Sequence, residues 1–210
     1  MVTMAIDHVG LYLLGDNVLC RIIGRIAFPL FAFMLVEGFK HTRSRPKYYA
    51  RIVVTAVISQ IILFFLDTAA HLEYRYNVLF TLGFAFVALI LAERGKFWLV
   101  GIPFLVLMAG SFECDYAIFG ILMIVGFYYA DKLFKNNRPV RLLADFAVLA
   151  AMMLSEANYD CWSIQNWAIL AIIPIALYSG KKGHRLPKML TYSFYPLHLL
   201  IILLILLIRY

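Results

Sequence analysis

The sequence predicts an all-α membrane protein, a polytopic transmembrane helical bundle of about nine spans with a cytoplasmic amino terminus. Its composition is the first reason: of the 210 residues, 64% are hydrophobic and 15% are charged. Soluble domains are roughly 45–50% apolar and about 25% charged. Apolar runs also recur along the whole chain, and the mean hydropathy is +0.85. Nine spans of about 20 residues leave about 30 residues for loops, so we treat residues 1–210 as one integral-membrane domain.

Each expected span is an apolar run bounded by turn or charged residues. In chain order these runs lie near residues 1–14, 18–39, 50–66, 78–92, 97–110, 116–130, 142–154, 164–178 and 190–208. Several are shorter than a comfortable crossing, so their ends are approximate, and two short runs can form one re-entrant pair.

The loops between these runs alternate in charge. Most of the 19 lysines and arginines lie in the segments 40–51, 94–96, 132–141 and 181–188. Acidic residues dominate the turn at Asp16 and the segments 67–75, 113–115 and 156–160. The positive-inside rule places the basic loops in the cytoplasm. The sequence therefore predicts a multi-pass protein of the cytoplasmic membrane.

The net charge of +7 is explained by these loops, which lie beside anionic lipid. We therefore predict the lipid bilayer, and not nucleic acid, as a partner. Cys20, Cys114 and Cys161 fall on the predicted outer side, where Cys114 and Cys161 either pair or stay free. The sequence has no CxxC motif or His/Cys cluster, and no metal site is predicted.

Charged residues in the first two spans are candidates for a functional site, because a charge in hydrocarbon costs at least about 2.5 to 3.5 kcal/mol. Asp7 and His8 are adjacent in the first span, and Arg21 and Arg25 lie in the second. His8 and Arg25 each stand about 12 to 14 Å from the hairpin turn, so we expect them at one depth. Neighbouring helix residues diverge in direction, so Asp7 is expected to face an arginine. The group is either an ion pair that fixes helix packing or a site where His8 transfers a proton.

Other polar and basic residues lie in or beside the later spans. Pro29 interrupts the second span and frees a backbone carbonyl near Arg25. The segment from Lys40 to Arg51 is the densest basic stretch. It is either a topology anchor or a docking surface for an anionic cytoplasmic cosubstrate. Further candidates for substrate contacts or structural hydrogen bonds are Asn77, Tyr116, Tyr195 and His198.

Five segments in order over nearly the whole chain carry a family resemblance. They are the Asp7-His8 pair, GRIAFPLFAFMLVEGFKHTRSRPKYYAR from Gly24, NVLFTLGFA from Asn77, YAIFG from Tyr116 and YPLHL from Tyr195. With these segments the sequence resembles the TraX family, which is associated with acetylation of the amino terminus of conjugative pilin. The family is similar to integral-membrane acyltransferases, which use a transmembrane His and Arg to move an acyl group from a cytoplasmic acyl-CoA.

The resemblance implies an acetyltransferase with acetyl-CoA as cosubstrate and a peptide, pilin-like or glycan acceptor. It implies a catalytic group of His8, Asp7 and Arg25. His8 is then a general base or transient acyl carrier, and Arg25, alone or with a polar residue such as Asn77, stabilises the oxyanion. The residues expected to contact the cosubstrate are Arg21, Glu37, Lys40, His41, Arg43, Arg45 and Arg51.

Two other classes of protein explain the same buried charges. A small proton-coupled transporter would use Asp7, His8 and Arg25 as a relay, although the sequence shows no internal repeat of the kind that many transporters carry. A structural subunit of a secretion apparatus would explain the hydrophobicity but would give the charges no purpose. Solute flux without any dependence on acyl-CoA would favour the transporter.

Overall fold

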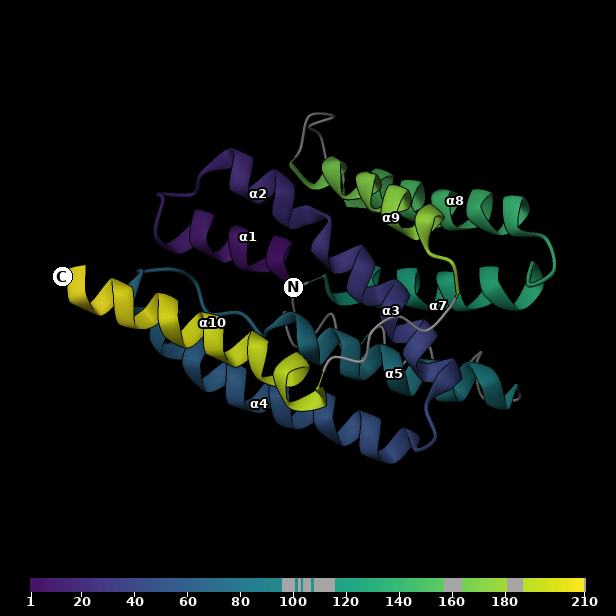
Figure 1. The fold of residues 1–210 in the computed structure, drawn as a ribbon, viewed down its shortest axis with the longest axis horizontal. Helices are drawn as coiled ribbons and strands as arrows, with labels where there is room; N and C mark the ends of the chain where they lie inside the picture. Colours follow the sequence, from purple (N-terminus) through teal and green to yellow (C-terminus); the bar gives the residue numbers. More distant parts are fainter. Residues whose placement is uncertain are drawn as a thin grey trace.

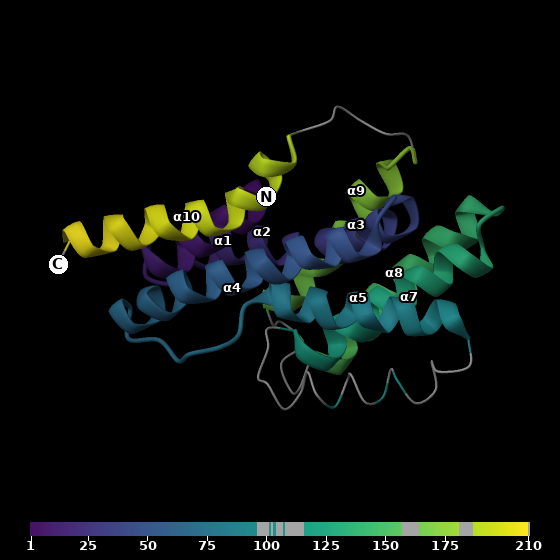
Figure 2. The same ribbon diagram turned by 90° about the horizontal axis from the view of Figure 1, so that it is seen from below.

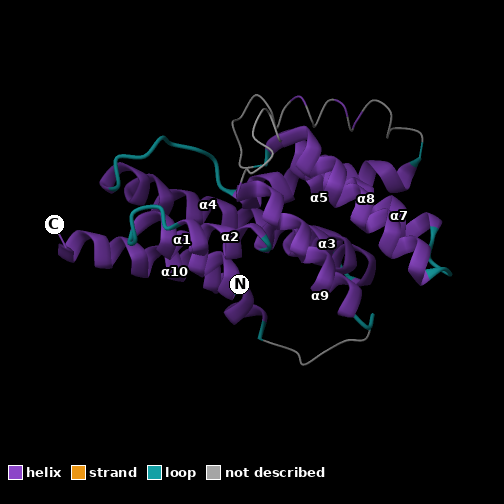
Figure 3. Cartoon of the chain, turned by 90° about the horizontal axis from the view of Figure 1, so that it is seen from above, coloured by secondary structure: helices purple, strands orange, loops and turns teal. Residues whose placement is uncertain are grey.

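The computed structural model describes residues 1–95, 101, 103, 107, 116–156, 164–180 and 187–209. Within these ranges the regular elements are all helices (Figure 3), which confirms the predicted all-α class. They are α1 (Val2–Tyr12), α2 (Val18–Arg25), α3 (Ala27–His41), α4 (Arg45–Ala69), α5 (Val78–Arg94), α7 (Ala117–Leu133), α8 (Arg138–Glu156), η1 (Ile164–Ala171), α9 (Ile172–Leu177) and α10 (Lys188–Arg209). The expected span 97–110 lies largely outside the described residues, as do Cys114 and Cys161.

Within the described ranges, three helical stretches are long and apolar enough to cross a membrane. They are Val18–His41, which joins α2 and α3, Arg45–Ala69 and Met189–Arg209. A shorter apolar stretch, Ile164–Leu177, joins η1 and α9. These lengths and compositions make the chain a membrane protein. Its total of about nine spans and the side of its amino terminus stay predictions.

The second expected span is divided into two helices, with the break at Ile26. Pro29 is the third residue of α3, and it has no N–H to donate to the carbonyl of Arg25 four residues earlier. Proline is tolerated at this position because the N–H groups of a first helical turn have no partner within the helix. The interruption predicted from Pro29 therefore falls just after Arg25, at the end of α2.

The helices form two packed groups that meet where α4 packs on α5 and α2 packs on η1 (Figures 1 and 2). In the first group, α1 packs on α2 and α10 packs on α4, around an apolar core that includes Leu66 and Leu199. In the second, α5, α7 and α8 pack in sequence and α3 lies against α7, around a core that includes Phe39, Phe86 and Phe127. Packing of these faces holds each group together, because each helix satisfies its backbone hydrogen bonds internally and associates with its neighbours through side chains.

The charged connections are sorted to opposite ends of the molecule (Figure 1). The ends of α3, α5 and α7 and the starts of α4 and α8 lie at one end, and they carry basic segments of the sequence. The α1–α2 turn with Asp16 and the end of α4 lie at the other. This sorting agrees with the alternation of loop charge, while which end faces the cytoplasm remains a prediction.

Candidate functional site

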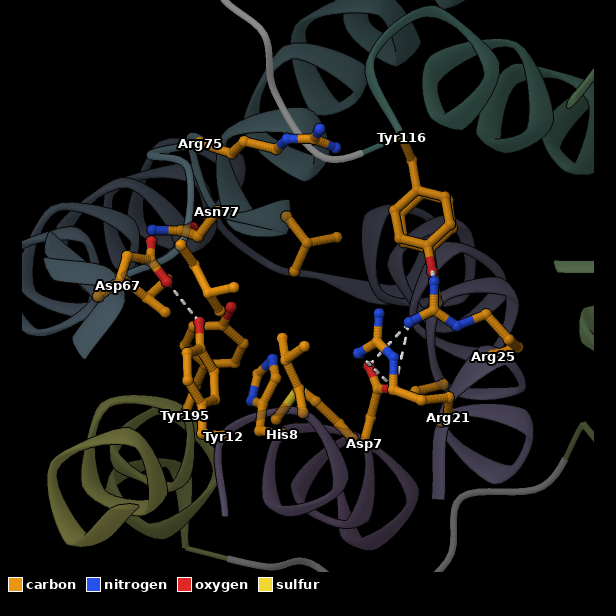
Figure 4. A pocket seen from close by; sticks show the side chains of 18 of the residues that line it. Asp7, His8, Tyr12, Arg21, Arg25, Asp67, Arg75, Asn77, Tyr116 and Tyr195 are labelled. Carbon is orange, nitrogen blue, oxygen red and sulfur yellow. Dashed lines mark hydrogen bonds and ion pairs between the residues drawn. The ribbon is translucent and has the colours of Figure 1, made fainter. Parts of the chain in front are cut away.

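A cavity of about 500 Å³ lies where the two helix groups meet, and residues from α1, α2, α3, α4, α5 and α10 line it. Its polar lining comprises Glu73 and the residues labelled in Figure 4, which are Asp7, His8, Tyr12, Arg21, Arg25, Asp67, Arg75, Asn77, Tyr116 and Tyr195. The structure thus brings together the three residues predicted as catalytic. It also places Asn77, Tyr116 and Tyr195 in the same cavity wall.

One carboxylate is held between two guanidinium groups in this wall (Figure 4). Arg25 donates from Nη2 to the two Asp7 oxygens at 3.1 and 3.0 Å, and Arg21 donates from Nη1 to Asp7 Oδ1 at 2.9 Å. This confirms that Asp7 faces arginine. The three side chains are 14 to 20% exposed, so their charges interact more strongly than surface charges. We call Asp7, Arg21 and Arg25 the cavity cluster.

The local sequence explains how the cavity cluster forms. Arg21 and Arg25 are four residues apart and so share one face of α2, whose start is capped by the Asn17 side chain. A Cβ at residue 24 would overlap the Asp7 side chain. Gly24 therefore allows α1 and α2 to approach closely enough for Arg25 Nη2 to contact both Asp7 oxygens. Arg21, which is also predicted to contact the cosubstrate, lies in this cluster, and its Nε contacts the exposed Asp16 at 3.2 Å.

Arg25 also connects the two helix groups. Its Nη1 donates to the Tyr116 hydroxyl at 3.4 Å and to Gln165 Oε1 at 3.2 Å. The Tyr116 ring stacks on Phe28 with 3.8 Å between ring centroids. Gln165 was missed by the sequence reasoning, because it lies 140 residues from Arg25 in a segment whose pattern marks only an apolar helix.

His8 is paired with a second histidine from the last helix. Its Nδ1 lies 2.7 Å from Nε2 of His198, and the two rings are parallel with centroids 5.0 Å apart. Nδ1 of His198 lies 2.8 Å from the backbone oxygen of Phe194. Tyr195 meets both histidine rings edge-on. The candidate residues His198 and Tyr195 therefore support His8, which itself lines the cavity.

A further carboxyl group, that of Asp67, lies on another side of the cavity. The sequence predicts Asp67 in a loop, but the structure places it in a helix. Asp67 is within α4 and 7% exposed, and its Oδ1 accepts a 2.6 Å hydrogen bond from the Tyr12 hydroxyl. The apolar pattern ended near residue 66, one residue before Asp67, while the helix continues to Ala69. The cavity therefore has carboxyl groups on two sides, at Asp7 in the cavity cluster and at Asp67 (Figure 4).

Asn77 has a structural task. Its amide nitrogen donates to the Ala56 carbonyl at 2.9 Å and to Gln60 Oε1 at 2.8 Å, and its side-chain oxygen accepts from the backbone N–H of Leu79 at 3.0 Å. Both amide protons are thus donated to α4 while the oxygen caps α5. Asn77 therefore joins α4 to the start of α5 at the cavity wall.

Most residues predicted to contact the cosubstrate lie at the opposite end of α3. There Glu37 and Lys40 meet Asp131 of α7 and Arg141 and Asp145 of α8, a group that we call the Asp131 cluster. Lys40 bridges Glu37 at 2.7 Å and Asp131 at 2.6 Å, and Arg141 contacts Asp131 at 2.5 Å and Glu37 at 3.4 Å. These contacts tie α3, α7 and α8 together.

The remaining predicted cosubstrate residues differ in their surroundings. His41, with a 70% exposed side chain, lies 3.6 Å from Glu37, and Arg43 is exposed. Arg45 is ion-paired with Glu93, and Arg51 lies over the Tyr192 ring at 5.8 Å. Within the described part of the chain, no group of three or more His, Cys, Asp or Glu residues is placed to hold a metal ion.

Comparison with known proteins agrees with these motifs. Residues 1–206 match the family described as "TraX protein". The chain belongs to the TraX family. It is 30% identical to the "Probable fimbrial assembly protein FimC, serogroup H1" of Dichelobacter nodosus, over 95% of this chain and 89% of that protein. It is 26% identical to "Protein TraX" of Escherichia coli, over 93% of this chain and 78% of that protein. No solved structure matches.

Proposed function

We propose that this TraX-family protein is an integral-membrane acetyltransferase, which moves an acetyl group from acetyl-CoA to an amine or hydroxyl of a peptide or envelope acceptor. The observation that carries this proposal is the position of His8 in the cavity wall beside the cavity cluster. An imidazole is a general base near neutral pH, and guanidinium groups stabilise developing negative charge in an enclosed site. The fimbrial role in the name of the Dichelobacter nodosus relative supports a pilin-like acceptor.

In the proposed reaction, His8 removes a proton from the acceptor nitrogen or oxygen as that atom attacks the thioester carbonyl. The carbonyl electron pair moves onto oxygen, and the resulting oxyanion accepts hydrogen bonds from Arg25. When the carbonyl re-forms, the C–S bond breaks and the CoA sulfur takes the proton from His8. The products are the acetylated acceptor and CoA.

Two neighbours of Arg25 complete the proposed site. Asp7 holds both guanidinium groups and offsets their mutual repulsion. The Tyr116 hydroxyl beside Arg25 Nη1 is our proposed second donor to the oxyanion. Among the predicted phosphate contacts, the exposed Arg43 is the one we propose for acetyl-CoA, because Lys40 and Arg45 have carboxylate partners.

Transfer of radiolabel from acetyl-CoA by the purified protein, with pilin-like peptides as acceptors, tests the proposal. His8→Ala should lower kcat/KM by about 10² to 10⁴. Arg25→Lys should lower it by about 10², because lysine keeps the charge but loses the planar fork. His71→Asn is the control, since His71 is exposed with a φ of 54° that asparagine tolerates.

Unchanged transfer in His8→Ala would overturn this mechanism. Unchanged transfer in Arg25→Lys would reduce Arg25 to a counter-ion of Asp7. If wild-type protein transfers no acetyl group but carries a proton-coupled solute flux in proteoliposomes without acyl-CoA, the transporter would replace the enzyme.

A further inference from the structure

The contact between His8 and His198 determines where protons sit in the cavity wall. Nδ1 of His198 faces the Phe194 carbonyl at 2.8 Å, and a carbonyl oxygen can only accept a hydrogen bond. This nitrogen therefore carries a proton. A neutral imidazole has one N–H, so Nε2 of His198 is an acceptor. Burial to 8% exposure favours the neutral ring, because an isolated buried charge is costly.

The protonation of His198 in turn determines which nitrogen of His8 carries a proton. Its Nδ1 lies 2.7 Å from the accepting Nε2 of His198, so the proton of this contact belongs to His8. Neutral His8 then has an unprotonated Nε2. In Figure 4 the His8 ring stands among the side chains that line the cavity, whereas His198 reaches it from α10.

We propose that His198 is a positioning residue that holds His8 as the Nδ1–H tautomer and thereby keeps Nε2 of His8 free to accept the proton of the acceptor. This role rests on the proposed acetyl transfer. When His8 takes up the proton at Nε2, it becomes an imidazolium whose Nδ1–H still donates to His198. No proton leaves the pair until His8 returns one to the CoA sulfur.

Ring contacts fix His198 in this orientation. Phe194 lies nearly parallel to the His198 ring with centroids 5.4 Å apart, and Tyr195 meets the same ring edge-on, also at 5.4 Å. Phe194 therefore supplies both the carbonyl that selects the tautomer and a ring that restrains rotation. Phe194, Tyr195 and His198 all lie on one stretch of α10, within the sequence YSFYPLHL that begins at Tyr192.

Two substitutions separate positioning from packing. His198→Gln offers an amide oxygen that accepts from Nδ1 of His8, while His198→Leu fills similar space without an acceptor. NMR of protein containing ¹⁵N-labelled histidine, with His8→Gln to assign the His8 signals, reports the His8 tautomer without any reaction. Wild type and His198→Gln should show Nδ1–H, and His198→Leu should show a mixture with Nε2–H.

Kinetics supply the second readout. His198→Leu should lower kcat by about 10² or more with an unchanged KM for acetyl-CoA, whereas His198→Gln should stay within about tenfold of wild type. The inference is overturned if His8 keeps Nδ1–H in His198→Leu, or if both variants lose activity equally. If wild type transfers no acetyl group, the proposed function fails, and the NMR result alone then supports or overturns the tautomer assignment.

Discussion

The cavity cluster and the Asp131 cluster are built from the same kinds of residue but differ in access and in sign of charge. In the cavity cluster two arginines share Asp7, and all three side chains line the cavity. In the Asp131 cluster three carboxyl groups share Lys40 and Arg141. None of the described cavity-lining residues belongs to this second cluster, and Asp145 is 1% exposed.

This difference separates the proposed catalytic site from a cluster that holds helices together. Surplus positive charge beside an open cavity stabilises an anion that forms there during a reaction. Surplus carboxyl groups packed between three helices, away from the cavity, fix how α3, α7 and α8 assemble. A buried ion cluster is therefore weak evidence for catalysis unless it borders a cavity.

Asp7→Asn tests the cavity cluster most severely. The change leaves Arg21 and Arg25 side by side without their shared carboxylate. Removing one partner of a buried ion pair costs about 3 to 5 kcal/mol. Because these groups are partly exposed, we expect the free energy of unfolding to fall by about 3 kcal/mol. Thermal unfolding in detergent measures it.

The second-site change Arg21→Gln should restore part of that stability, because it removes one of the two unpaired cations. If Asp7→Asn unfolds at the wild-type temperature, the two arginines are hydrated in the cavity and the shared carboxylate is not what holds them.

Gly24→Ala probes the close approach on which the cavity cluster depends. A Cβ at this position would overlap the Asp7 carboxylate, so α1 must move away from α2. Overpacking of this kind costs about 1 to 3 kcal/mol and should lower acetyl transfer together with the unfolding temperature. Gly83→Ala is the matched control, because a Cβ there meets no described atom within 4 Å. Equal effects of the two changes would point to helix flexibility as the cause.

The sequence predicted the parts of this architecture that depend on local pattern. Spacing along one hairpin is enough to bring Asp7 to Arg25, and Pro29 is enough to place the break after α2. Contacts between distant helices depend on register that periodicity does not encode. The pairing of His8 with His198, 190 residues apart, and the contact of Arg25 with Gln165, 140 residues apart, are therefore visible only in the structure.

In the Asp131 cluster, Asp145→Asn should have the opposite effect on stability to that of Asp7→Asn. Arg141 Nε lies 3.8 Å from Asp145 Oδ2, and neither Asp145 oxygen has a hydrogen-bond partner in the described part of the chain. Replacing this carboxyl group by an amide removes surplus negative charge, so stability should rise by about 1 kcal/mol or stay unchanged. Thermal unfolding under the conditions used for Asp7→Asn decides it. A loss comparable to that of Asp7→Asn would make the two clusters equivalent and end the distinction.

The pair of Arg45 and Glu93 is the exposed counterpart of Arg25 and Asp7, and it should show the smallest effect. Arg45 Nη2 donates to Glu93 Oε1 at 2.8 Å, and this hydrogen bond lowers the pKa of Glu93, which lies beyond the apolar run 78–92. A carboxyl group with a lowered pKa in the folded state contributes its stability above the unfolded pKa of about 4.3 and loses it as pH falls through the folded value.

A double-mutant cycle with Arg45→Ala and Glu93→Gln should therefore give a coupling below about 1 kcal/mol at pH 7 that declines as the pH falls below about 4.3. The side chains are 37 and 43% exposed, so solvent and salt screen the pair. Added salt should weaken this coupling while it leaves that of Arg25 with Asp7 nearly unchanged. If the exposed pair couples as strongly as the cavity pair, burial does not explain the strength of the cavity cluster, and the arginines owe their hold on Asp7 to geometry alone.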